Sequence, residues 1–352
     1  MTPAPGSPLA LLAALCGPGV IRTDPAELGP VQLDHRRLYR GKALGLALPR
    51  DVAEVARILA FCDEHRIGVV PQAGNTSYCG GATPDETGTQ LVLSLRRMDA
   101  VRSIDPLNYS MVVEAGCVLA RVQQAAEAAG RFFPLALGSE GSCQVGGNLS
   151  TNAGGLNVVR YGMARDLVLG LEVVLPDGRV LSNLSSLRKD NTGYDLKSLF
   201  IGAAGTLGVI TAASLRLFPV LRDVATAFVA VPDPRAAVEL LARLRESSGD
   251  RVSSFELLPE VALRLAERHV PGVSAPLGAG SPWYVLCELS SPRADEGLGA
   301  LLEAELGRAL AAALVTDAAI AQGERQRQAF WRLRESIPEA QTREGASLKH
   351  DV

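Results

Sequence analysis

The sequence predicts an α+β protein of two domains, and three observations support this prediction. The chain has 352 residues, more than the ~150 residues of one ordinary core. It is 47% hydrophobic and 21% charged, so it can bury a sizeable core and carries no compositional mark of disorder. Glycine-rich loops also give way, near residue 222, to a regular alternation of strands and helices. We therefore expect an N-terminal helical segment (1–37), a first domain (38–221) and a second domain (222–352).

The charge balance argues against two classes of partner. The formal net charge is −3, from 38 acidic and 35 basic side chains, so no broad field would attract nucleic acid or an anionic membrane. No stretch is long enough to span a bilayer, and we expect no integral membrane segment. The apolar stretch Leu9 to Cys16 lacks a preceding basic run, so it is interpreted as a first helix and not as a signal peptide.

The cysteines indicate a reducing compartment. The chain has six cysteines, which lie far apart without a C-x-x-C pair, as is typical of reduced buried thiols. We expect neither disulfides nor a zinc knuckle, and we expect a protein of the cytoplasm or of the periphery of the inner membrane.

The first domain is predicted to contain two glycine-rich loops. Asp51 is a plausible N-cap for a helix that runs to His65. Ile67 to Val70 then forms a short strand stopped by Pro71, and the first loop, 72–81, follows. The second loop, 138–155, is long enough to suggest a function. The other expected elements are strands at 91–93 and 111–113, a helix at 119–129, a hairpin at 167–181 around Pro176-Asp177-Gly178, and a strand at 209–218.

The second domain alternates strands and helices. The expected elements are strands at 228–231, 254–258 and 283–289 and near Val315, with helices at 234–246, 259–268, 295–313 and 322–339. This order is typical of a ferredoxin-like α+β layer.

Both glycine-rich loops are suited to an anion. Each concentrates Gly, Ser, Thr and Asn after a strand, which leaves backbone N–H groups available to converge on a phosphate. Neither loop is G-x-G-x-x-G opening a helix or G-x-x-x-x-G-K-[ST], so a Rossmann or P-loop site is disfavoured.

Several ordered motifs carry a family resemblance. Pro71–Thr76 (PQAGNT) and Gly138–Gly155 (GSEGSCQVGGNLSTNAGG) resemble the FAD-binding domain of the vanillyl-alcohol-oxidase/PCMH superfamily. Ser186–Lys197 (SLRKDNTGYDLK) and Gly205–Thr211 (GTLGVIT) resemble its D-2-hydroxyacid dehydrogenases, of the D-lactate, glycolate-oxidase flavin-subunit and D-2-hydroxyglutarate types. The resemblance extends from about Leu38 to the last residue. It implies a PCMH-type FAD-binding domain of two α+β subdomains, followed by the ferredoxin-like cap domain.

The resemblance also implies which residues bind FAD. The first loop would place its N–H groups on the pyrophosphate, and the second would extend from there toward the isoalloxazine. The FAD-binding positions so assigned are Pro71, Gln72, Ala73, Gly74, Asn75, Thr76, Gly138, Ser142, Gly146, Gly147, Asn148, Thr151, Asn152, Gly154, Gly208, Val209 and Ile210. Many relatives have glycine at Ala73 and glutamate at Ala204. We expect non-covalent FAD, because no histidine lies in either loop.

The cap segments would supply the substrate site. Trp331–Pro338 and Lys349–Asp351 resemble segments that place an arginine and a lysine on a substrate carboxylate, which assigns Arg334 and Lys349 to substrate binding. The alternative for Arg334 is a helix-surface arginine paired with Glu335 or with solvent.

Two departures from the family bear on the chemistry. Pro338 stands where the D-2-hydroxyglutarate enzymes carry a threonine. The family's H-x-G-D-G-N-x-H segment, which supplies a divalent metal such as zinc and a proton-abstracting histidine, has no counterpart in the chain. We therefore interpret the sequence as a C-terminally truncated or fragmentary enzyme, assign no catalytic residue and no metal ligand, and expect a metal only with that segment.

The leading interpretation is an FAD-linked D-2-hydroxyacid dehydrogenase that passes electrons to an unidentified acceptor. The second is an FAD-binding domain or subunit without turnover of its own. A relative such as an enolpyruvyl-sugar reductase or an alkylglycerone-phosphate synthase is disfavoured by the KDNTGYD run. Cys143 is interpreted as a buried thiol, because nothing beside it in sequence would activate it.

Overall fold

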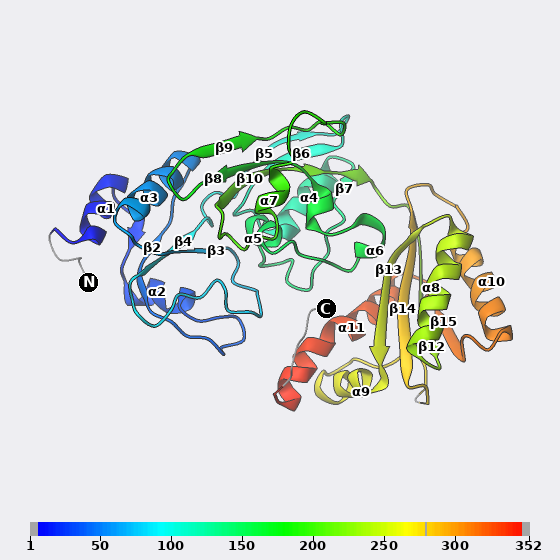
Figure 1. Cartoon of the computed structure of the whole chain (residues 1–352). Helices are drawn as coiled ribbons and strands as arrows, with labels where there is room; N and C mark the ends of the chain where they lie inside the picture. Colours follow the sequence, from blue (N-terminus) through cyan, green and yellow to red (C-terminus); the bar gives the residue numbers. More distant parts are fainter. Residues whose placement is uncertain (1–5, 279, 347–352) are drawn as a thin grey trace. The chain divides into compact units, whose positions relative to one another are not determined.

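The structure is a computed structural model that describes residues 6–278 and 280–346 (Figure 1). The chain forms two compact units. Unit 1 comprises the residues up to Gly155 together with Gly162–Pro219, and unit 2 comprises Leu156–Tyr161 together with the residues from Val220 onward.

The first sheet of unit 1 has four strands in the order β1-β2-β4-β3: β1 (Ile21–Arg22), β2 (Ala43–Ala47), β4 (Gln90–Ser94) and β3 (Val69–Gln72). The strands β2, β4 and β3 are parallel, and β1 pairs antiparallel with β2. The helices of this part are α1 (Pro8–Cys16), α2 (Pro25–Val31) and α3 (Val52–Glu64). Because β1 lies before residue 38, the N-terminal segment contributes a strand to unit 1.

The sequence pattern explains α3. The Asp51 side chain accepts a hydrogen bond of 2.8 Å from the backbone N–H of Glu54, which caps the helix as expected. Val55, Ile58 and Leu59 recur at helical spacing and are buried against the first sheet and α1.

The strand β3 extends further than the sequence suggested. Pro71 was expected to stop it, but β3 includes Pro71 and ends at Gln72, and Pro71 lies opposite Leu93. Proline is tolerated here because β3 is the edge strand of its sheet, where a missing N–H need not break the ladder.

The second sheet of unit 1 has five strands in the order β5-β6-β10-β8-β9. They are β5 (Val101–Asp105), β6 (Ser110–Glu114), β10 (Val209–Arg216), β8 (Val168–Val174) and β9 (Val180–Asn183), and every neighbouring pair is antiparallel. The predicted hairpin around Pro176-Asp177-Gly178 is confirmed, because it joins β8 to β9. Other elements of this part are α4 (Leu119–Ala128), β7 (Arg131–Phe132), the 3₁₀ turn Ala164–Leu167, α7 (Lys197–Phe200) and β11 (Phe218–Pro219).

The second glycine-rich segment is not a loop throughout. We expected a loop over 138–155, but Val145–Ser150 forms the short helix α5. Glycine is a poor helix former, and the burial of Val145 and Leu149 in unit 1 offsets this weakness.

Unit 2 contains a four-stranded sheet in the order β13-β14-β12-β15, from β12 (Asp223–Val231), β13 (Val252–Pro259), β14 (Trp283–Ser291) and β15 (Asp317–Ile320). One face packs against α8 (Pro234–Ser248) and α10 (Leu298–Ala311), and the other against α9 (Glu260–His269) and α11 (Glu324–Glu344). This order and alternation confirm the ferredoxin-like prediction for the second half of the chain.

A short segment from the first half of the sequence belongs to unit 2. Leu156–Tyr161, with the helix α6 (Val158–Tyr161), directly follows the second glycine-rich segment. Arg160 donates to the backbone oxygen of Ser290 and, at 3.0 Å, to its hydroxyl. Ser254 bonds to the Asn157 side chain at 3.0 Å, and Val159 packs on the core beneath α8 and α10. Nothing in the sequence predicts this docked segment.

Replacing Arg160 with alanine is expected to destabilise unit 2 by about 2 kcal/mol, because hydrogen bonds from a charged donor are each worth roughly 1.5–3 kcal/mol and Ser290 is fully buried. Urea unfolding followed by tryptophan fluorescence measures this, since both tryptophans of the chain, Trp283 and Trp331, lie in unit 2. An unchanged midpoint and slope would show that the segment does not stabilise unit 2.

Candidate functional site

The first loop is held so that its backbone amides are available. Asn75 adopts the left-handed conformation, with φ of 51°, which asparagine tolerates better than most residues. Its side-chain amide donates to the Leu33 oxygen at 2.8 Å. Within residues 6–278 and 280–346, the backbone N–H groups of Gly74, Asn75 and Thr76 have no hydrogen-bond acceptor. Unpartnered N–H groups in a left-handed turn are typical of an anion-binding concavity.

The two glycine-rich segments touch through their backbones. A Cβ placed on Gly74 would lie 2.2 Å from the Ser142 oxygen and 2.9 Å from the Cys143 Cα. A Cβ placed on Gly147 would lie 2.8 Å from the Cβ of Ala73. The structure therefore brings together the two stretches that the sequence assigned to one ligand, and only glycine allows this approach.

Several of the assigned side chains are bonded within the protein. The assigned Thr151 donates its hydroxyl to the oxygen of Gly147 at 3.0 Å, and its unassigned neighbour Ser150 donates to the oxygen of Gly146 at 2.7 Å. The buried side chain of Asn148 lies 3.6 Å from the Cys143 sulfur. These contacts shape α5, so we expect the backbone to supply most of the ligand contacts.

Gln72 and Asn152 also have structural partners. The Gln72 side-chain amide donates to the oxygens of Val31 and Ala82, at 2.9 and 2.8 Å. The Asn152 side-chain oxygen accepts from the backbone N–H of Arg165 at 3.0 Å. Among the remaining assigned positions, Gly138 has open space where a Cβ would be and Gly154 lies beside Met163.

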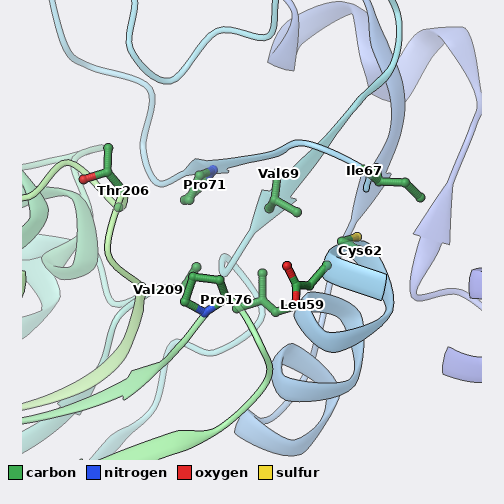
Figure 2. A pocket seen from close by; sticks show the side chains of 11 residues that line it. Leu59, Cys62, Ile67, Val69, Pro71, Pro176, Thr206 and Val209 are labelled. Atoms are coloured by element: carbon green, nitrogen blue, oxygen red, sulfur yellow. The ribbon is translucent and has the colours of Figure 1, made fainter. Parts of the chain in front are cut away.

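A third stretch, the turn before β10, lies beside the first loop. A Cβ on Gly205 would lie 3.0 Å from the Pro71 ring. Figure 2 shows a pocket at this place, lined by Leu59, Cys62, Asp63, Ile67, Val69, Pro71, Pro176, Gly205, Thr206, Gly208 and Val209. Its volume is about 220 Å³, below the ~300–1,000 Å³ of a typical ligand pocket, so it can hold only part of a dinucleotide.

The thiol that lines this pocket is not reactive. Cys62 is 1% exposed, and burial raises the pKa of its thiol to about 12. It is therefore protonated at neutral pH and acts as an apolar wall. Cys143 is also buried and unpaired, which agrees with the interpretation of its sequence context.

Sequence reasoning missed the segment that supports the first loop. Asp34 is buried, and its carboxylate accepts from the backbone N–H groups of Arg36 (3.0 Å) and Tyr39 (2.6 Å). Burial alone would raise the pKa of Asp34, but these N–H groups lower it more, so the pKa lies below its usual range. The ring of His35 lies 6.0 Å from that of Tyr78 in the first loop. The dense run of basic and aromatic residues at 35–40 was the available signal.

The assigned substrate residues have different outcomes. Arg334 lies on α11 and is paired with Glu256 of β13, with 2.7 Å between Nη2 and Oε2, and not with Glu335 or solvent alone as the alternative supposed. Lys349 lies outside the described residues. The part of the chain that the structure describes holds no group of three or more His, Cys, Asp or Glu side chains placed to bind a metal. None of its helices combines the length and hydropathy that a bilayer crossing requires.

Two domain families match the chain. The family described as "FAD binding domain" matches residues 43–183, and the family described as "FAD linked oxidases, C-terminal domain" matches residues 220–352. The chain is 45% identical to mitochondrial D-2-hydroxyglutarate dehydrogenase of Bos taurus, over 95% of this chain and 61% of that protein. It is 35% identical to a D-2-hydroxyglutarate–pyruvate transhydrogenase of Saccharomyces cerevisiae, over 93% and 66%. The chain thus spans less than two thirds of the length of these relatives.

Solved structures confirm the fold. Alkyldihydroxyacetonephosphate synthase matches with a TM-score of 0.74 at 17% identity, over 96% of this chain and 64% of that one. p-Cresol methylhydroxylase matches with a TM-score of 0.70 at 17% identity, over 93% and 68%. The prediction of a PCMH-type FAD-binding domain followed by an α+β cap domain is therefore confirmed. The expectation of a cytoplasmic protein has no support, because the Bos taurus relative is named as mitochondrial.

Proposed function

The chain belongs to the FAD-linked oxidases that join an FAD binding domain to the FAD-linked oxidase C-terminal domain, and we propose that it oxidises a D-2-hydroxy acid to the 2-oxo acid. The substrate class is that of lactate or 2-hydroxyglutarate. The 45% identity to the D-2-hydroxyglutarate dehydrogenase of Bos taurus supports the substrate class, and the backbone contact of the two glycine-rich segments at Gly74, beside three unpartnered N–H groups, supports the binding of FAD.

The residues of unit 1 fit FAD. The N–H groups of Gly74, Asn75 and Thr76 would donate to the pyrophosphate oxygens, because an anion satisfies amides that the protein leaves without acceptors. The pocket of Figure 2 would hold one flat part of the molecule. FAD would bind without a covalent bond, since no histidine belongs to either segment.

The chain's own residues would orient the substrate. FAD, when bound, supplies an acceptor for the hydride on the carbon that bears the hydroxyl, and the hydroxyl proton goes to a base, a role assigned to no residue of the chain. Arg334 would bind the substrate carboxylate through two parallel N–H···O bonds, and Lys349 would add a second positive charge. Fixing the acid at its carboxylate limits the orientations of the C–H bond, which is the main contribution that binding residues make to such a transfer.

The substrate can be tested directly. The purified chain should be yellow, and acid precipitation should release its flavin into the supernatant. Anaerobic mixing with D-lactate or D-2-hydroxyglutarate then tests turnover, because a D-2-hydroxyacid dehydrogenase bleaches the flavin with the D-acid and not with its L-enantiomer. Flavin that remains in the pellet would contradict non-covalent binding.

The second candidate function is an FAD-binding domain or subunit without turnover of its own. The contact at Gly74 and the unpartnered N–H groups beside it bear on FAD binding alone, so they fit this candidate equally well. A yellow chain that stays oxidised with both D-acids would support this candidate over the dehydrogenase.

A further inference from the structure

Two carboxylates on the sheet of unit 2 each hold an arginine of α11. Glu288 of β14 pairs with Arg327, and Glu256 of β13 pairs with Arg334. The two arginines are seven residues apart, so they lie on the same face of the helix, two turns from each other. The two pairs differ in how many hydrogen bonds the carboxylate accepts and in how exposed that carboxylate is.

The pair formed by Glu288 is closed. Its carboxylate accepts from Thr226 Oγ1 at 2.8 Å, from Arg327 Nε and Nη2 at 2.8 and 3.1 Å, and from Trp331 Nε1 at 3.0 Å. The Glu288 side chain is 6% exposed. A carboxylate with this many donors has no capacity left for exchange, so Arg327 is a structural arginine.

The pair formed by Glu256 is open. One oxygen, Oε2, meets both Nε and Nη2 of Arg334, at 2.8 and 2.7 Å. The side chains of Arg334 and Glu256 are 30% and 23% exposed. Among the residues that the structure describes, neither side chain forms another hydrogen bond or ion pair.

We propose that Glu256 is a positioning residue for Arg334 and limits how tightly Arg334 binds the substrate carboxylate. This inference rests on the proposed function of Arg334. Glu256 holds the guanidinium by its Nε side, which fixes the plane of the group. The outer edge formed by Nη1 and Nη2 can then donate two parallel hydrogen bonds to a second carboxylate. The negative charge of Glu256 at the same time partly neutralises the arginine, which allows the product anion to leave.

Two substitutions separate these two effects. Glutamine in Glu256→Gln keeps an oxygen that accepts from Nε but removes the negative charge. Loss of such a half-exposed ion pair changes the binding constant of the acid by up to about fivefold. Alanine in Glu256→Ala removes the charge and also frees the guanidinium, and ordering a free arginine costs about tenfold. We expect Glu256→Gln to bind carboxylates about fivefold tighter than the wild type, and Glu256→Ala to bind them about tenfold more weakly than Glu256→Gln.

The experiment is calorimetric titration of the FAD-loaded 352-residue chain with 2-oxoglutarate and with pyruvate. These 2-oxo acids carry the same carboxylate as the proposed substrates and cannot reduce the flavin. Arg334→Ala tests the substrate site itself. Glu239→Gln is the charge control, because Glu239 forms an exposed pair with Arg243 on α8, on the opposite face of the sheet.

The outcomes separate the inference from the proposed function. The inference is supported if Glu256→Gln binds the acids more tightly than the wild type, Glu256→Ala binds them more weakly than Glu256→Gln, and Glu239→Gln binds them like the wild type. If Arg334→Ala loses binding but both Glu256 variants bind like the wild type, the inference is overturned and the proposed function stands. If neither acid binds the wild type, or if Arg334→Ala binds as well as the wild type, the assignment of Arg334 is wrong and the inference is overturned with it.

Discussion

Replacing Glu288 with alanine is expected to lower the free energy of unfolding of unit 2 by about 3 kcal/mol. The substitution leaves Arg327 with only the exposed Glu324 as an anionic partner, and it leaves the side-chain donors of Trp331 and Thr226 without their acceptor. Removing one partner of a buried pair costs roughly 3–5 kcal/mol. We take the lower end because the Arg327 side chain is 33% exposed, so water can partly solvate its charge.

The measurement is urea unfolding followed by tryptophan fluorescence, with Glu239→Ala as the control. Glu239 and Arg243 form an exposed pair within one helix, worth about 0.3–0.5 kcal/mol, so the control should unfold close to the wild type. A loss in Glu288→Ala no larger than that of the control would contradict the view that this carboxylate anchors α11 to the sheet.

Local sequence signals predicted much of unit 2. The helix α8 has an aspartate cap, Asp233, with 2.8 Å between its side-chain oxygen and the Ala236 N–H, and it ends at Gly249 in the left-handed conformation. The strands β12 and β14 are almost entirely buried, and each contains a five-residue apolar run in the sequence, Ala227–Val231 and Trp283–Cys287. Such signals lie within one element, which is why the sequence alone can show them.

Features that depend on distant contacts could not be predicted. The helix α5 has two glycines in its first turn, and only its burial in unit 1 makes it helical. The pairing of Arg334 joins two residues 78 positions apart, and no pattern in α11 distinguishes Arg334 from Arg327. The docking of Asn157 and Arg160 likewise requires Ser254 and Ser290, which lie far along the chain.

The candidate site was predicted in part. Motif resemblance assigned both glycine-rich segments to one ligand, and the structure places their backbones in contact at Gly74. It did not reveal that Gln72, Asn148 and Asn152 use their side chains within the protein. A loop that binds a ligand and a loop that only makes a tight turn are both rich in glycine and asparagine, so the sequence cannot separate the two roles.

Replacing Gly74 with alanine is expected to weaken FAD binding at least tenfold. The alanine Cβ would lie 2.2 Å from the Ser142 oxygen and 2.9 Å from the Cys143 Cα, closer than real Cβ atoms come to backbone. The two segments must therefore move apart, which shifts the N–H groups of Gly74 and its neighbours from the positions proposed to bind the pyrophosphate. Hydrogen bonds to a charged acceptor contribute roughly 1.5–3 kcal/mol each, and a loss of 1.4 kcal/mol already corresponds to tenfold.

The matched control is Gly141→Ala. Gly141 lies in the second segment, directly before Ser142, does not adopt a positive φ and has no atom within 4 Å of an added Cβ. Fluorescence titration of the flavin-free chain with FAD gives the dissociation constant of both variants. We expect Gly141→Ala to bind FAD like the wild type. A loss of affinity in Gly74→Ala then reports the backbone contact between the two segments and not a general cost of replacing a loop glycine. Equal affinity in all three proteins would show that FAD does not depend on the contact between the two segments, and the cofactor would then have to be placed elsewhere in unit 1.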